Sequence, residues 1–191
     1  MTRPRNRYVQ DLRRHYESVW GAPGTVLRWN QGPVHELPED FCVLEFAPTN
    51  KREMWTYATC GMAGQHDDAP IELHLFSPLS SDKHVELLTA IAHYHRTSAR
   101  LGLGHTVNLG RSWLPGSSCN FGLISLPYLD GPTLEIMNHP DFKKPVRLLW
   151  LIPITKEELI FKKTHGLEAL EERFEKTGFN YLDPHRSSVV G

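Results

Sequence analysis

The run Val146–Ile154, VRLLWLIPI, constrains the fold of this chain more than any other segment. Arg147 is its only charged residue, and the run is far shorter than the roughly 20 apolar residues that a membrane-spanning helix needs. A short, almost continuously apolar run is typical of a central β-strand buried on both faces. Such a strand needs a sizeable core around it, and the hydrophobic content of 40% supplies one.

Other segments show the period-two patterns of strands or the 3.6-residue period of helices. In the run 71–76, apolar Ile71, Leu73 and Leu75 alternate with Glu72, His74 and Phe76, which predicts a strand with two distinct faces. Strands are predicted at 41–46, 54–60, 71–76, 105–109, 121–126 and 146–154. Helices are predicted at 5–20, from the N-cap residues Ser80–Asp82 to a stop at Gly102 or Gly104, after Thr155, and at 166–176.

Strands and helices mix without a regular βαβ alternation, so the sequence predicts an α+β fold rather than a doubly wound sheet. No convincing linker interrupts it, and we expect one domain over residues 1–191 with an irregular tail at 178–191. The core is expected to contain Trp55, Tyr57, Leu73, Leu75, Leu88, Ile91, Leu149 and Leu151.

The charge balance gives little attraction to nucleic acid or to membranes, since the formal net charge is −1. Arg3, Arg5, Arg7, Arg13 and Arg14 make the N-terminal segment basic, and the expected explanation is a solvated helix face. This segment has no apolar stretch typical of a secretion signal. Cys42, Cys60 and Cys119 form no CxxC pair. Buried thiols in a reducing compartment are therefore expected, which favours the cytoplasm.

No motif predicts a catalytic or cofactor site. The segment LGLGHTVNLG follows a helix and precedes a strand, the reverse of the order in a dinucleotide-binding loop. His93 and His95 lie about 200° apart around a helix and cannot share a metal from one face. The remaining metal candidate is His66, Asp67 and Asp68 with His74, which would suit a metal-assisted hydrolase. A solvated loop is the expected explanation, so no metal is predicted.

Several stretches together carry a family resemblance. They are MWTYATCGM, IELHLF, ELLTAIAHYH, LGLGHTVNLGRSWLPGS, FGLISLPYL and VRLLWLIPITKEEL with the helix after it. In this order the chain resembles the suppressor-of-fused domain family from about residue 41 to residue 175. The resemblance implies an α+β domain with a mixed, largely antiparallel β-sheet flanked by helices, and a non-catalytic protein-binding function.

Animal members of this family are larger, carry a second domain and hold a transcription factor by enclosing a short segment of it. Stand-alone bacterial members resemble immunity proteins that neutralise a toxin, here expected to be encoded nearby. A regulatory or scaffolding module is the alternative. Because toxins that attack nucleic acid tend to be basic, an acidic patch would help capture. His66, Asp67 and Asp68 are candidates, with Asp130, Glu135 and Asp141.

The partner-binding hypothesis centres on Trp113, which lies in the turn-rich segment GRSWLPG. Interfaces favour aromatic residues in loops held by a rigid sheet. Arg111 beside it could pair with an acidic group, and the loop of Gln65, His66, Asp67 and Asp68 would form a polar rim if both loops lie at one end of the sheet. In the alternative interpretation, Trp113 folds back as a lid on the core.

Overall fold

The computed structural model describes residues 4–191, with side chains from residue 7 onward. Its helices are α1 (Pro4–Trp20), α2 (Asp82–Thr97), α3 (Pro132–Glu135), α4 (Lys156–His165) and α5 (Leu167–Thr177), with a 3-10 turn η1 (Val34–Glu36). Its strands are β1 (Thr25–Leu27), β2 (Cys42–Phe46), β3 (Trp55–Cys60), β4 (Ile71–Ser77), β5 (Thr106–Asn108), β6 (Phe121–Ser125), β7 (Ile136–Met137) and β8 (Val146–Ile154). None of the described helices is long and apolar enough to cross a membrane.

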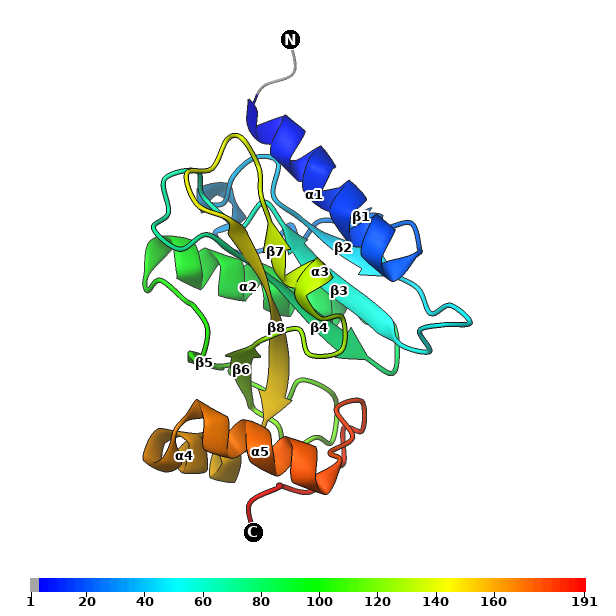
Figure 1. Cartoon of the computed structure of the whole chain (residues 1–191), viewed down its shortest axis with the longest axis vertical. Coiled ribbons are helices and arrows are strands. Elements are labelled where there is room, and N and C mark those ends of the chain that lie inside the picture. The colour runs from blue at the N-terminus through cyan, green and yellow to red at the C-terminus, as the bar shows by residue number, and fades with distance from the viewer. Residues whose placement is uncertain (1–3) are drawn as a thin grey trace.

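All the strands form one mixed sheet (Figure 1), in the order β1-β2-β3-β4-β8-β6-β5, with β7 also paired to β8. Among the strand pairs of the described residues, only β4–β8 is parallel. The first half of β8 lies between β4 and β7, and its second half pairs with β6 from Trp150 to Ile154. The predicted α+β class and largely antiparallel sheet are thus confirmed.

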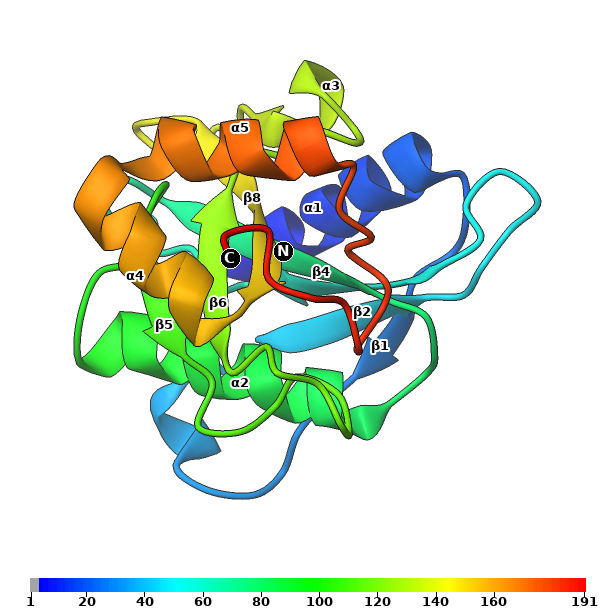
Figure 2. The same cartoon turned by 90° about the horizontal axis from the view of Figure 1, so that it is seen from below.

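Helices cover both faces of the sheet (Figure 2). α2 lies on one face, and α1 and α5 lie on the other. Strand β8 contributes side chains to both layers: Leu149 and Leu151 pack with the α2 core, whereas Leu148, Trp150 and Ile152 pack beneath α1 and α5. Only Arg147 is less than fully buried in this strand. The prediction that the apolar run is buried on both faces is confirmed.

Local signals in the sequence define the helix ends. Ser81 caps α2 by accepting a hydrogen bond from the Lys83 N–H. At α4, the Thr155 side chain accepts from the Glu158 N–H while Glu158 accepts from the Thr155 N–H, which completes a capping box. α5 ends at Gly178, whose left-handed conformation (φ 58°) suits glycine.

The prediction that β4 has two distinct faces is confirmed, since Ile71, Leu73 and Leu75 join one core and Phe76 joins another. Both faces are buried, and Glu72 and His74 are 0% exposed. Hydrogen bonds satisfy Glu72, and aromatic rings surround His74, so side chains that look solvent-facing in the sequence lie inside. Four very short elements were not predicted from the sequence: β1, η1, α3 and β7. Each has only two to four residues, which is too short to show the periodicity of a helix or a strand.

Most of the predicted core is confirmed. All of the predicted residues are buried except Trp55, which is partly buried at the edge of the α2 core. Cys42, Cys60 and Cys119 are free and buried, as expected. In the basic N-terminal segment, Arg7 and Arg14 are mostly exposed and pair with Asp11, which fits a solvated face. Arg3 and the side chain of Arg5 lie outside the described residues.

Shortening Leu151 is expected to destabilise the fold strongly. Leu151 is 1% exposed and packs directly over Gly122, where an added Cβ would lie 2.6 Å from the leucine Cδ1. Leu151→Ala would remove this close packing and should lower the unfolding free energy by roughly 2–5 kcal/mol in urea denaturation. Ile160→Ala, at a 54% exposed position on α4, is the control and should change it by less than about 0.5 kcal/mol. Equal effects of the two substitutions would contradict the assignment of the core.

Candidate partner-binding surfaces

The segment around Trp113 lies against the N-terminal half of α2. The Trp113 ring is only 4% exposed, stacks on the His84 ring at 5.9 Å between centroids, and donates a hydrogen bond to Ser117. Trp113 therefore packs as a lid in a small cluster with Leu114 and Cys119. Arg111 is exposed and donates to Glu86 at 2.8 Å. Of the two candidate binding residues Trp113 and Arg111, only Arg111 has its polar group exposed to solvent.

The loop that holds Gln65, His66, Asp67 and Asp68 lies against the other end of α2. Asp67 accepts hydrogen bonds from the Gly64 N–H at 2.7 Å and from Arg96 at 2.6 Å. Burial acts to raise the pKa of Asp67, but His95, the Gly64 N–H and Arg96 outweigh it, so the pKa is lowered overall. His66 and Asp68 are exposed and Gln65 is partly exposed. Asp67 is thus an anchor for the loop, and its neighbours face solvent.

Asp67→Asn is expected to lower the unfolding free energy at pH 7 by roughly 1–3 kcal/mol, because a charged hydrogen-bond acceptor is lost beside two arginines. A lowered pKa in the folded state stabilises the fold above the unfolded pKa of about 4, and this contribution disappears as pH falls. The difference in unfolding free energy between the wild type and Asp67→Asn should therefore become smaller below about pH 4, as measured by thermal or urea unfolding. The exposed neighbour provides a control, since His66→Ala should have almost no effect.

The two predicted loops do not form one surface. Arg111 contacts Lys83 and Glu86 near the start of α2, whereas Asp67 contacts Arg96 near its end. Ten residues of helix between Glu86 and Arg96 span about 15 Å. The condition for a polar rim, that both loops lie at one end of the sheet, is not met, because the two loops contact opposite ends of α2.

The residues considered for a metal site are also separated. His74 lies on the α1 side of the sheet, with its ring 5.7 Å from the Trp20 ring, whereas Asp67 contacts α2 on the opposite side. Burial, with a smaller effect of Arg52, lowers the pKa of His74 to about 3, so the imidazole is neutral. Over the described side chains, no group of three His, Cys, Asp or Glu residues is arranged to hold a metal ion.

The other acidic candidates each have a basic neighbour. Asp130 pairs with Arg52, Glu135 pairs with Arg147, and Asp141 lies 3.7 Å from His139. They are distributed among different elements and do not join the loop of His66 and Asp68 in one patch. A stronger concentration of negative charge lies on α5, where Glu168, Glu171, Glu172 and Glu175 share one face.

That face of α5 borders a groove of about 600 Å³, which we call the α5 groove. Its floor consists of the buried side chains of Trp150, Ile152 and Phe174. The four glutamates form one rim, and the exposed Tyr128 and Leu129 form part of another. Sequence analysis identified the amphipathic helix but not the groove, because the lining also includes residues of β8 and of the segment after α5.

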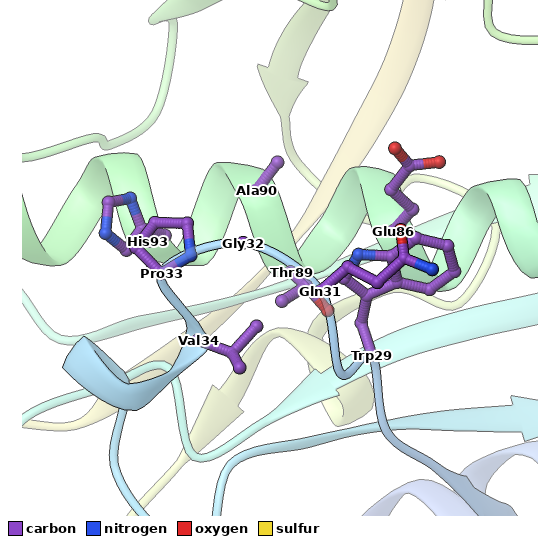
Figure 3. A pocket seen from close by; sticks show the side chains of 9 residues that line it. All are labelled: Trp29, Gln31, Gly32, Pro33, Val34, Glu86, Thr89, Ala90 and His93. Atoms are coloured by element: carbon purple, nitrogen blue, oxygen red, sulfur yellow. The ribbon is translucent and has the colours of Figure 1, made fainter.

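A second cavity, of about 370 Å³, lies between α2 and the segment before η1 (Figure 3). Trp29, Pro33 and Val34 face Glu86 and His93 across it. Both of these polar side chains already have partners within the chain, because Glu86 pairs with Arg111 and His93 with Glu36. Glu86 and His93 are therefore already engaged within the chain.

The structure defines the class of protein as an α+β domain, in which helices cover both faces of an open mixed sheet. Its surface carries shallow grooves of a kind suited to binding. The sequence profile described as suppressor of fused protein (SUFU) matches residues 37–187. The chain therefore belongs to the suppressor-of-fused family. The match extends beyond the predicted limits of 41 and 175 and includes part of the irregular tail.

Solved structures agree with this assignment. A crystal structure described as a suppressor-of-fused homolog from Neisseria gonorrhoeae FA 1090 is 35% identical, with a TM-score of 0.84, and the alignment covers 97% of this chain and 98% of that one. A chain in the Sufu-Fu complex is 14% identical with a TM-score of 0.71, covering 95% and 92%.

Drosophila Suppressor of Fused is 17% identical with a TM-score of 0.66, and this chain spans about half of it, since the alignment covers 97% of this chain and 51% of that one. At such low identity, the Drosophila protein and the chain of the Sufu-Fu complex show the shared fold alone. Comparison with curated proteins finds no match.

Proposed function

We propose that this protein is a non-catalytic protein-binding domain that acts in the cytoplasm as an immunity protein against a toxin encoded nearby. The observation that carries the proposal is membership of a family whose fold occurs in a protein complex, the Sufu-Fu complex. The homolog from Neisseria gonorrhoeae, which is 35% identical, shares the fold over nearly the whole chain and supports the family assignment on which the proposal rests. A regulatory or scaffolding module is the second candidate on the same observation.

Several features of the structure favour binding over catalysis. Of the residues considered for a hydrolase, His74 lies on the opposite side of the sheet from the loop that holds His66, Asp67 and Asp68. The three buried free thiols suit a reducing compartment. On α5, Glu168 and Glu175 have no side-chain partner among the described residues, and they suit capture of a basic protein because complementary charge speeds association.

Co-expression tests the proposal. Each neighbouring gene product would be expressed with and without this protein, and cell growth and tandem-affinity capture would be measured. The expected result is that one neighbour is toxic alone, is tolerated with this protein, and copurifies with it. If a neighbour copurifies without being toxic, a regulatory module is the better interpretation. If none copurifies, the immunity proposal is wrong.

The same assay tests the interface first inferred from the sequence, which remains a proposal. Arg111→Ala removes the exposed guanidinium without disturbing the buried Trp113 ring, and His66→Ala with Asp68→Ala removes the exposed groups of the loop. Loss of protection in either variant, with an unchanged circular dichroism spectrum, would place the contact there. Full protection by both would place it elsewhere.

A further inference from the structure

The α5 groove combines an apolar floor with a rim of unsatisfied negative charge. Its lining contains four glutamates and no lysine or arginine. Over the described residues, the Glu168 and Glu175 carboxylates have no ion-pair or hydrogen-bond partner. Glu172 pairs with Lys176 at 3.1 Å, but both side chains are mostly exposed, so a basic ligand can replace Lys176 as the partner of Glu172.

Hydrogen bonds hold the rim in place without neutralising it. Glu171 accepts hydrogen bonds from the hydroxyls of Ser125 and Tyr128, and both donors are neutral. Burial and the bond to Glu171 raise the pKa of Tyr128 to about 12, so the phenol stays protonated at physiological pH. The charge of Glu171 therefore remains available to a ligand, while the strand end and the helix are fixed relative to each other.

The position of Glu175 is unfavourable for the domain alone. It lies in the last turn of α5, where the helix dipole is negative and cations rather than carboxylates are stabilising. A basic ligand beside it would relieve this repulsion.

The floor is suited to one large apolar side chain. Trp150, Ile152 and Phe174 are each 5% exposed or less, and the exposed lip residues Tyr128 (57%) and Leu129 (47%) extend the apolar surface. Exposed apolar side chains beside a concave site are typical of interaction surfaces.

We propose that the α5 groove binds a basic segment of the protein partner, with one aromatic or large aliphatic side chain on the floor and Lys or Arg residues paired with Glu168 and Glu175. This proposal rests on the protein-binding function proposed above and adds the chemistry of the partner. Glu168 and Glu175 are separated by about 10 Å along the helix, the length of about three residues of an extended peptide. The segment should therefore carry basic residues about three positions apart on either side of its apolar anchor.

A direct test uses a short fluorescein-labelled peptide in which one tryptophan is flanked on each side by two arginines. Its binding to the full chain would be followed by fluorescence anisotropy at low salt. Saturable binding is expected, with affinity falling as salt screens the rim. The doubly substituted variant Glu168→Lys, Glu175→Lys should bind about tenfold more weakly or worse. Replacing the tryptophan of the peptide by alanine should also weaken binding.

The matched control changes the same charge elsewhere. Glu53→Lys with Asp82→Lys alters two exposed carboxylates outside the groove and should leave the affinity within about twofold. If this control weakens binding as much as the groove variant, only the overall charge matters and the proposal is wrong. If the lysine variant unfolds by circular dichroism, Glu168→Gln with Glu175→Gln provides the milder substitution, and unchanged affinity in it would overturn the proposal.

The experiments distinguish a failure of the groove proposal from a failure of the proposed protein-binding function. If the groove variant still protects against the toxin and copurifies with it, the groove is not the docking site, although the protein-binding function stands. If the wild type captures no neighbouring protein and also fails to bind the peptide, both proposals are wrong. A dimer detected by sedimentation for the wild type and abolished in the groove variant would assign the groove to a second copy of this chain and overturn the assignment to a partner segment.

Discussion

Arg186→Ala is expected to lower the unfolding free energy by roughly 3–5 kcal/mol, because it would leave a buried carboxylate without its cation. Arg186 binds Glu158 through two hydrogen bonds of 2.6 and 2.8 Å and also donates to the Pro153 carbonyl at 3.0 Å. The Glu158 side chain is 0% exposed and that of Arg186 is 6% exposed. In a chain of this size, the midpoint of thermal unfolding should fall by about 8–15 °C.

The size of this effect depends on where Glu158 lies. The same carboxylate completes the capping box of α4 and accepts from the Val189 N–H at 3.0 Å, so it joins β8, α4 and the C-terminal tail. Lys176→Ala is the control, since it removes a cation from a pair that is exposed at the surface, and it should change stability by less than about 0.5 kcal/mol. Arg186→Lys should be intermediate, because lysine keeps the charge but loses the paired geometry. Equal stability of Arg186→Ala and Lys176→Ala in calorimetry would refute the role of this ion pair.

Glu72→Ala should have a similar effect, roughly 3–5 kcal/mol, since it would leave several buried donors without an acceptor. Glu72 is 0% exposed in β4. It accepts from the Tyr8 hydroxyl at 2.9 Å, from the Thr59 hydroxyl at 2.6 Å, and from the N–H groups of Gly61, Met62 and Ala63. This one carboxylate therefore connects α1, β3, β4 and the turn after β3.

Milder substitutions in this hydrogen-bond network measure how much individual donors and acceptors contribute to stability. Tyr8→Phe removes a single hydroxyl donor and retains the ring that packs beneath α1, so it should cost about 1 kcal/mol. Glu72→Gln retains the shape and one acceptor oxygen and should fall between Tyr8→Phe and Glu72→Ala. Urea denaturation measures all three. A cost for Glu72→Ala no larger than that for Tyr8→Phe would show that the backbone donors are satisfied without the carboxylate.

The α5 groove shows what residue spacing can and cannot predict about a site. The spacing of Leu167, Leu170 and Phe174 predicts which face of α5 packs inward. In the structure, Leu170 and Phe174 are buried in the core beneath the helix, and Leu167 is partly buried against it. The floor of the groove, however, brings together residues from β8, α5 and the segment that follows it. No local pattern relates those segments, so the groove was not predictable from the sequence.

For Trp113, the local structure was predictable from the sequence, but the burial of its side chain was not. Its turn-rich sequence predicts a loop, and the structure has no helix or strand there. Whether an aromatic side chain in a loop is exposed depends on what packs against it, and here His84 and Leu114 cover the ring. Burial of a loop residue is decided by distant segments, which is why sequence left both interpretations open.

The sequence by itself determined the elements that depend on neighbouring residues: the buried strand at 146–154, the capping box at Thr155, the amphipathic helix after Gly166 and the α+β class. Only the tertiary structure decided the interactions between distant residues. The hydrogen bond from Tyr8 to Glu72 crosses 64 positions, and the ion pair of Arg186 with Glu158 crosses 28. Period and capping are local properties of the backbone, whereas the partner of a buried charge depends on the order of strands in the sheet and on where the tail returns to it.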